Sequence, residues 1–69
     1  MNDARLCLNK QLLDEVLIKR KLSYSDLARL IGWSRANLYY HLKNRTVKGA
    51  EQCSQALRIN LRDLLVINR

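Results

Sequence analysis

The stretch SYSDLARLIGWSRANLYYHLKN, from Ser23 to Asn44, decides the fold. Ser23 followed three residues later by Asp26 has the form of a capping box, with Asp in place of the usual Glu or Gln. Gly32 is placed to end the helix that begins there, because glycine adopts a left-handed backbone without steric cost. The first half of the stretch therefore predicts one short helix that closes at Gly32.

The second half predicts another helix in close contact with the first. Ser34 is the expected N-cap of a helix from Arg35 to about Asn44. Ala28 offers a small surface where the two helices cross, and the apolar Trp33 fills the gap between them. Two helices joined by the three-residue turn at 32–34 follow the plan of a DNA-binding helix-turn-helix. In this plan, the first helix braces on the DNA backbone and the second enters the groove.

Three further helices are expected around this pair. One runs roughly from Lys10 to Lys21, with Asn9 as its N-cap and with Leu8 and Leu13 as a hydrophobic staple. Another runs roughly from Lys48 to Leu57, and the last begins after Asn60. The apolar spacing predicts an inward stripe of Leu13, Val16, Leu17 and Arg20 on the first, and burial of Leu27, Leu30, Ile31, Leu38, Leu42, Cys53, Ala56, Leu57, Leu61, Leu64 and Leu65 elsewhere.

Length and composition agree with a single all-α domain. The chain has 69 residues, no proline, no phenylalanine and two glycines, which is poor material for a turn-rich β fold. A chain of this size buries only about 60% of its unfolded surface, so a partner would help to stabilise it. Residues 1–8 are interpreted as an N-terminal arm or an extra turn, and residues 9–69 as the helix-turn-helix DNA-binding domain.

The charge distribution favours a polyanionic partner. Thirteen Lys and Arg against six Asp and Glu give a net charge of +7. No acidic residue lies between Asp26 and Glu51, whereas that span contains Arg29, Arg35, His41, Lys43, Arg45 and Lys48. Because this basic span coincides with the turn pattern, we interpret it as a DNA-binding surface and not merely as a solvated face.

Several other classes of protein are disfavoured. No apolar run approaches the roughly 18 residues of a membrane span, and MNDARLCLNK does not resemble a signal peptide, so a cytoplasmic protein is expected. Cys7 and Cys53 lie far apart and the chain has one histidine, which argues against a zinc site and favours two buried thiols. The six carboxylates are scattered along the sequence and there is no Gly-rich loop, so no group of residues resembles a catalytic site. We therefore expect neither an enzyme nor a cofactor or small-molecule ligand. RNA or single-stranded DNA would favour a sheet with stacked aromatics, which is missing from the pattern.

Residues 10–65 resemble the helix-turn-helix domain of the Cro and C-type phage repressors, the lambda-repressor-like DNA-binding domain that plasmid and restriction-modification controllers share. The resemblance lies in LSYSDLARLIGWSRANLYYHLKN and in AEQCSQALRINLRDLL, where an Ala-Leu pair precedes a loop and a Leu-x-x-Leu-Leu helix. It implies a compact five-helix domain that acts as a transcriptional repressor or regulator in a bacterium or in the bacterial host of a phage. It also implies a symmetric dimer on a near-palindromic operator.

The chain departs from the pattern of that family at four places. His41 stands where an apolar residue is common, and Arg58 where glycine is frequent. Asn44-Arg45 replaces a frequent Asn-Gly, and Trp33 is bulkier than the usual Val or Ile. We interpret His41 as a partly buried histidine with a local hydrogen bond, in preference to a pH switch.

Exposed positions at the start of the second helix are expected to reach base edges. Arg35 is the strongest candidate, since a guanidinium pairs bidentately with guanine; the alternative is a phosphate contact. Ala36 would touch a thymine methyl group, and Asn37 would bond adenine or a phosphate or would simply lie on the helix surface. Tyr39 is expected to face DNA more directly than Tyr40, although one of the two tyrosines could cover the core edge. The predicted base-reading residues are Ser34, Arg35, Ala36, Asn37, Tyr39 and Tyr40.

Phosphates are expected at the first helix N-terminus and after the second helix. The residues concerned are Ser23, Tyr24, Ser25, Lys43, Asn44, Arg45, Thr46 and Lys48.

A homodimer contact is predicted at Leu64, Val66 and Ile67. The alternative is that Val66 and Ile67 pack back on the helix at 10–21. A protein-interaction module, such as an antitoxin or adaptor with the same fold, is the alternative function, and salt-dependent binding to duplex DNA distinguishes the two.

Overall fold

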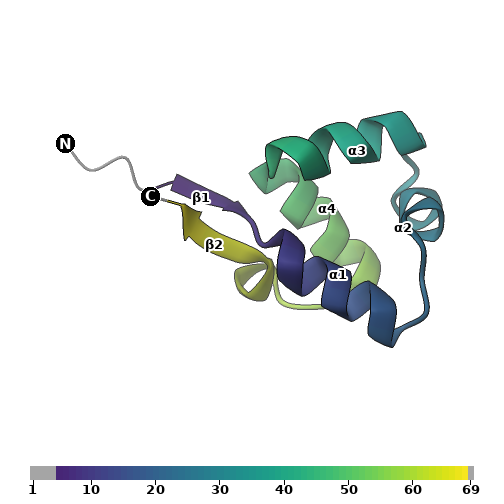
Figure 1. The fold of residues 1–69 in the computed structure, drawn as a ribbon, viewed down its shortest axis with the longest axis horizontal. Helices are drawn as coiled ribbons and strands as arrows, with labels where there is room; N and C mark the ends of the chain where they lie inside the picture. Colours follow the sequence, from purple (N-terminus) through teal and green to yellow (C-terminus); the bar gives the residue numbers. More distant parts are fainter. Residues whose placement is uncertain (1–4, 69) are drawn as a thin grey trace.

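The structure is a computed structural model that describes residues 5–68. Its elements follow in the order β1 (Arg5–Leu8), α1 (Lys10–Lys19), α2 (Tyr24–Ile31), α3 (Arg35–Asn44), α4 (Val47–Leu57), the 3-10 turn η1 (Leu61–Leu64) and β2 (Leu65–Asn68) (Figure 1). The α-helices form the body of the molecule, and β1 and β2 pair into an antiparallel ribbon that projects from one side of it. Across residues 5–68, every helix is too short or too polar to span a lipid bilayer.

The capping residues predicted in the central stretch are confirmed. Ser23 Oγ accepts a hydrogen bond from the Asp26 N–H (3.1 Å), and the Asp26 carboxylate accepts one from the Ser23 N–H (2.9 Å). Gly32 closes α2 at φ 87°, where a side chain would strain the backbone. Ser34 Oγ accepts from the Asn37 N–H (3.1 Å) and opens α3. Each cap satisfies a donor that a helix start leaves unpaired, which is why both helices begin where the sequence predicts.

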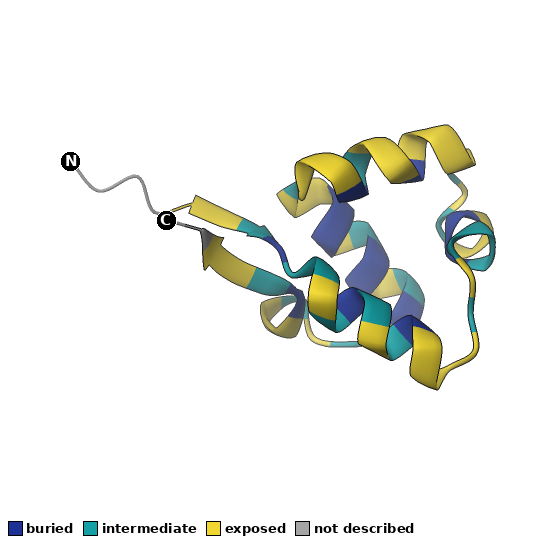
Figure 2. Cartoon of the chain, viewed as in Figure 1, coloured by how far each residue is buried: buried dark blue, intermediate teal, exposed yellow. Residues whose placement is uncertain are grey.

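One hydrophobic core joins the helices to the base of the ribbon (Figure 2). It consists of Leu8, Leu13, Leu17, Leu27, Ala28, Leu38, Leu42, Ala50, Cys53, Leu57 and Leu64. The prediction that Leu30 is buried is wrong, because this side chain is 57% exposed. Successive helical residues are about 100° apart, so Leu30 lies roughly 200° around α2 from Ala28, which faces the core.

The expectation of five α-helices is also wrong. Leu61–Leu64 makes only a single 3-10 turn, and β2 begins directly after it. β2 pairs with β1 in the register Arg5↔Asn68, Leu6↔Ile67, Cys7↔Val66 and Leu8↔Leu65. The segment interpreted as an arm or an extra turn, residues 1–8, thus contains a strand from Arg5 onward; residues 1–4 lie outside the described residues.

The ribbon has no sequence signature because its strands are not joined by a turn. A hairpin can be recognised in a sequence by Gly, Asn or Pro residues at the turn between its two strands. Here the whole helical body connects β1 to β2, so neither strand is recognisable without its distant partner. Leu64, at the end of η1 just before β2, is completely buried in the core, at 0% exposure. Its predicted place in a dimer contact is therefore wrong, since it belongs to the core.

Three helix ends use a left-handed residue that is not glycine. Lys21 (φ 55°), Arg45 (φ 49°) and Arg58 (φ 56°) follow α1, α3 and α4, respectively. Lys21 explains why α1 ends at Lys19, two residues before the predicted end. The left-handed conformation costs an L-residue about 1–2 kcal/mol, so each of these positions stores strain that glycine would relieve.

Arg58→Gly is expected to raise the free energy of unfolding by about 1 kcal/mol, because part of the relieved strain is offset by the greater chain entropy of glycine when unfolded. Thermal unfolding followed by circular dichroism measures the gain as a rise in Tm of about 4–8 °C. Arg45→Gly is the matched comparison at the same kind of helix end. A lower Tm in Arg58→Gly would mean that the arginine side chain contributes more than its backbone costs.

The two thiols differ in their exposure to solvent, so they should differ in their rates of reaction with a thiol reagent. Cys53 is fully buried in α4, and this burial raises the pKa of its thiol to about 11, whereas Cys7 on β1 is only half-buried. Since the thiolate is the reactive form, a disulfide reagent at pH 8 should modify one thiol of the native protein quickly and the second only on unfolding. Cys7→Ser should abolish the fast phase. Rapid modification of native Cys7→Ser would contradict the buried position of Cys53.

Candidate nucleic-acid interface

Helix α3 presents a broad polar and aromatic face to solvent. Leu38 and Leu42 are its buried residues, and they anchor it to the core. The six predicted base-reading residues are all exposed: Ser34, Arg35, Ala36, Asn37, Tyr39 and Tyr40. Figure 2 shows this outer face of α3 as an almost continuous exposed surface. The structure therefore leaves every one of these side chains accessible, although Ser34 Oγ already serves as the N-cap.

The turn between α2 and α3 holds the two helices at close range. The Ala28 carbonyl accepts hydrogen bonds from the N–H groups of both Gly32 (2.8 Å) and Trp33 (2.9 Å). Ala28 is buried, and its small side chain leaves room for the crossing helix. Trp33 is partly buried against the core, as expected for a residue that fills the gap between the helices.

Two contacts join the start of α2 to the outer face of α3. The Arg35 guanidinium donates a long hydrogen bond to Ser25 Oγ (3.4 Å). The rings of Tyr24 and Tyr39 meet edge to face, with centroids 5.8 Å apart and planes at 82°. Aromatic pairs in this geometry contribute about 0.5–1.5 kcal/mol beyond their burial. The predicted phosphate-binding start of α2 and the predicted base-reading part of α3 are thus brought together.

Tyr24 is also tied to α1. Its hydroxyl donates to the Asp14 carboxylate, which also accepts from Lys10 Nζ at 2.9 Å. Burial alone would raise the pKa of Asp14, but the hydrogen bonds from Tyr24 and Lys10 outweigh it and lower that pKa. Burial and the hydrogen bond to Asp14 raise the pKa of the Tyr24 hydroxyl. A phosphate approaching this hydroxyl would have to compete with Asp14, so the structure gives Tyr24 a bracing position between helices.

The polar groups of the turn after α3 are largely occupied by hydrogen bonds within the fold. Thr46 Oγ1 accepts from the Gly49 N–H (2.9 Å) as the N-cap of α4, and it also bonds His41 Nδ1 (2.7 Å). The Asn44 amide donates to the Tyr40 carbonyl (2.9 Å). Among the predicted phosphate-binding residues, Ser23, Asn44 and Thr46 therefore have side chains already committed to the fold.

His41 links α3 to the start of α4 and to the turn before α3. Its ring stacks on Trp33, with centroids 4.4 Å apart and planes at 19°, and the hydrogen bond to Thr46 confirms the predicted local bonding. A Cβ at Gly49 would lie 3.0 Å from both His41 Cβ and Thr46 Oγ1. Gly49 thus permits the close approach of α3 to the start of α4. The sequence alone does not reveal this role, because the contact with His41 depends on how α3 packs on α4.

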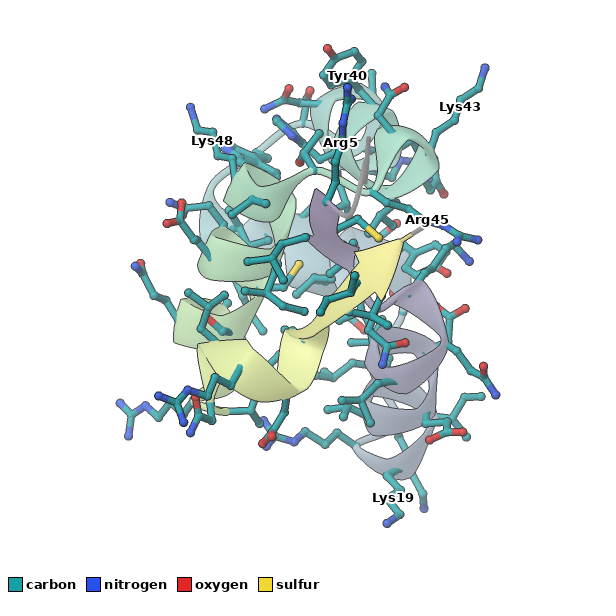
Figure 3. All side chains as sticks on the ribbon, turned by 90° about the vertical axis from the view of Figure 1, so that its left-hand side faces the viewer. Arg5, Lys19, Tyr40, Lys43, Arg45 and Lys48 are labelled. Atoms are coloured by element: carbon teal, nitrogen blue, oxygen red, sulfur yellow. The ribbon has the colours of Figure 1, made fainter. Side chains whose placement is uncertain are left out.

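Three exposed cations remain available at this side of the molecule. Lys43, Arg45 and Lys48 form no ion pair with a carboxylate of residues 5–68. In Figure 3, Tyr40, Lys43 and Lys48 project at one end of the molecule and Arg45 just below them, whereas Lys19 lies at the opposite end. The cations thus flank α3, in a span without acidic residues, which is the electrostatic arrangement that attracts a nucleic-acid backbone.

The fold and this exposed helix define a helix-turn-helix DNA-binding domain. Residues 12–69 match the family model of the Cro/C1-type HTH DNA-binding domain. Because this match covers well over half of the chain, the protein belongs to that family. No curated protein and no solved structure matches the chain.

Proposed function

We propose that the protein is a sequence-specific regulator of transcription, a Cro-like phage or prophage repressor that binds a near-palindromic operator in double-stranded DNA as a dimer. The exposed face of α3 carries the proposal. This helix buries two leucines and turns arginine, asparagine and tyrosine side chains outward, with no carboxylate among its residues. A helix of this kind fits the major groove, where base edges differ in their pattern of donors and acceptors.

Within this surface, the residues divide into two roles. Arg35, Asn37 and Tyr39 lie toward the start of α3, the part of a recognition helix that meets base edges. Lys43 lies in the last turn of α3, and Arg45 and Lys48 lie beyond its end. Cations at these positions contact phosphates and set the register of the protein on DNA. The start of α2 contributes less than the sequence predicts, because the Asp26 carboxylate already occupies its N-terminus.

The dimer is proposed to form through the outer half of the ribbon. Leu6 and Ile67 are direct partners in register and are 54% and 57% exposed, and Val66 beside them is also exposed. An isolated two-stranded ribbon is marginally stable in water, so a second copy covering these side chains would stabilise it. A two-fold axis here would present two copies of α3 to one duplex.

The decisive experiment is selection of bound sequences from a pool of random duplex DNA, followed by binding at several salt concentrations. We expect an enriched site with two related half-sites. With six or more phosphates neutralised per dimer, affinity should fall about 10³-fold or more between 50 and 200 mM salt. Absence of salt-sensitive binding would refute the proposal and favour a protein-interaction module such as an antitoxin or adaptor.

Lys48→Ala is expected to weaken binding to the selected site and to random DNA by the same factor. The reason is that a phosphate contact carries no sequence information. In a gel-shift titration, the slope of log affinity against log salt should become shallower by about 0.9 per bound protomer. A loss confined to the selected site would contradict a phosphate contact and assign Lys48 to base recognition.

A further inference from the structure

The ribbon begins next to the turn that follows α3. The Leu8 N–H donates a hydrogen bond to the Arg45 carbonyl at 3.0 Å, so the end of β1 is fastened to the predicted phosphate-binding turn. Leu8 is buried at this junction, while Arg5 at the other end of the strand is exposed. A strand rises about 3.3 Å per residue, which places Arg5 about 10 Å beyond the turn.

The Arg5 side chain is directed to the same end of the molecule as the outer face of α3. In Figure 3 it rises from β1 toward the level of Tyr40 and Lys43, away from Lys19 at the opposite end. Arg5 thereby lies toward the same end of the molecule as Lys43, Arg45 and Lys48, on a different element.

No described group gives Arg5 a structural partner. Its neighbour in register is Asn68, the next residues on β1 are Leu6 and Cys7, and no carboxylate of residues 5–68 lies within ion-pair distance. A cation that supports the fold would be expected to pair with an acid or to cap a helix. Arg5 does neither within the part of the chain that the structure describes.

We propose that Arg5 binds the DNA backbone, so that the ribbon extends the DNA-binding surface of each protomer beyond the helix-turn-helix. This rests on the proposed function, in which α3 lies in the major groove and the turn at Arg45 meets the backbone. A displacement of about 10 Å from that turn corresponds to about three base-pair rises of 3.4 Å. Arg5 also lies outside residues 12–69, the part of the chain matched by the family.

The contact is to phosphate and not to a base edge. Arg5 sits on a strand beside the body, while the groove is filled by α3, so the sugar–phosphate chain is the part of the duplex within its reach. A phosphate contact adds affinity without sequence preference and adds to the salt dependence. These two properties separate it from a residue that reads bases and from one that only supports the dimer.

The test compares Arg5→Ala and Arg5→Lys with wild type in the full chain, using the selected operator and a random-sequence duplex. Lys19→Ala is the matched control, since it removes one exposed positive charge at the far end of the molecule. Arg5→Ala should weaken binding to both duplexes about five- to tenfold per protomer at 100 mM salt, with a slope shallower by about 0.9 per protomer. Arg5→Lys should restore most of the loss, and Lys19→Ala should bind like wild type.

Ethylation interference on the operator locates the contact. Wild type should be sensitive to ethylated phosphates outside the segment covered by α3, and Arg5→Ala should lose that sensitivity while keeping the rest. An unchanged salt slope in Arg5→Ala, an equal loss in Lys19→Ala, or a loss accompanied by dissociation of the dimer in sedimentation would each overturn the assignment. If wild type itself shows no salt-sensitive DNA binding, the proposed function fails instead, so the two failures are distinguishable.

Discussion

Leu38→Ala is expected to leave much of the protein unfolded at 37 °C. Leu38 is fully buried on the inner face of α3, and truncation of such a leucine costs about 2–5 kcal/mol through lost burial and the cavity left behind. A domain of this length has a total stability of only about 3–10 kcal/mol. The loss is therefore comparable with the whole free energy of unfolding, and DNA binding should disappear with the fold.

Urea and thermal unfolding followed by circular dichroism measure this effect. A loss of 2 kcal/mol or more should lower the Tm by about 10 °C or more in a chain of this size. Leu30→Ala is the matched control, because Leu30 is mostly exposed on α2 and its truncation should change stability by no more than about 0.5 kcal/mol. Equal costs for the two substitutions would mean that α2 turns a different face to the core than the structure shows.

Arg35→Ala is expected to have the largest effect on sequence recognition. A bidentate arginine–guanine pair is worth about 1–3 kcal/mol of discrimination, which corresponds to about five- to 150-fold in affinity. In the structure, the Arg35 guanidinium lies near the start of α2, 3.4 Å from Ser25 Oγ. Affinity for the operator should fall, and preference should relax at one position in each half-site.

Selection from random DNA with wild type, Arg35→Ala and Arg35→Lys gives the readout. Arg35→Lys keeps the charge but loses the planar fork, so it should also lose the preference at that position. Lys43→Ala serves as the comparison, since a phosphate contact there should weaken binding while leaving the selected sequence intact. Weaker binding by Arg35→Ala with an unchanged selected sequence would assign Arg35 to the phosphate backbone.

The sequence predicts which segment forms the candidate site, but it does not predict which of the polar side chains there are free to bind a ligand. Exposure of Arg35 follows from helix periodicity once Leu38 and Leu42 are recognised as the buried pair, whereas the exposure of both Tyr39 and Tyr40 is established only by the structure. Helix periodicity does not reveal which polar side chains are already hydrogen-bonded within the fold. Thr46 is taken up by His41 and by the start of α4, and the Tyr24 hydroxyl by Asp14 on α1. Each of these partnerships depends on how helices are placed in space.

The central helix pair from Ser23 to Asn44 was determined by the sequence itself. Its capping box, its left-handed glycine and its two buried leucines act over three or four residues, so they can be recognised wherever they occur. These local interactions are sufficient to place α3 behind α2 in the chain and to leave its outer face exposed.

The ribbon, by contrast, was decided only by the tertiary structure. Arg5–Leu8 and Leu65–Asn68 become strands because the folded helices bring together two segments whose paired residues are 57 to 63 positions apart in the sequence. A strand satisfies its backbone hydrogen bonds on a partner and not within itself, so no property of either segment alone could reveal it. That pairing leaves Leu6 and Ile67 exposed and carries Arg5 to the side of the molecule on which α3 presents its outer face.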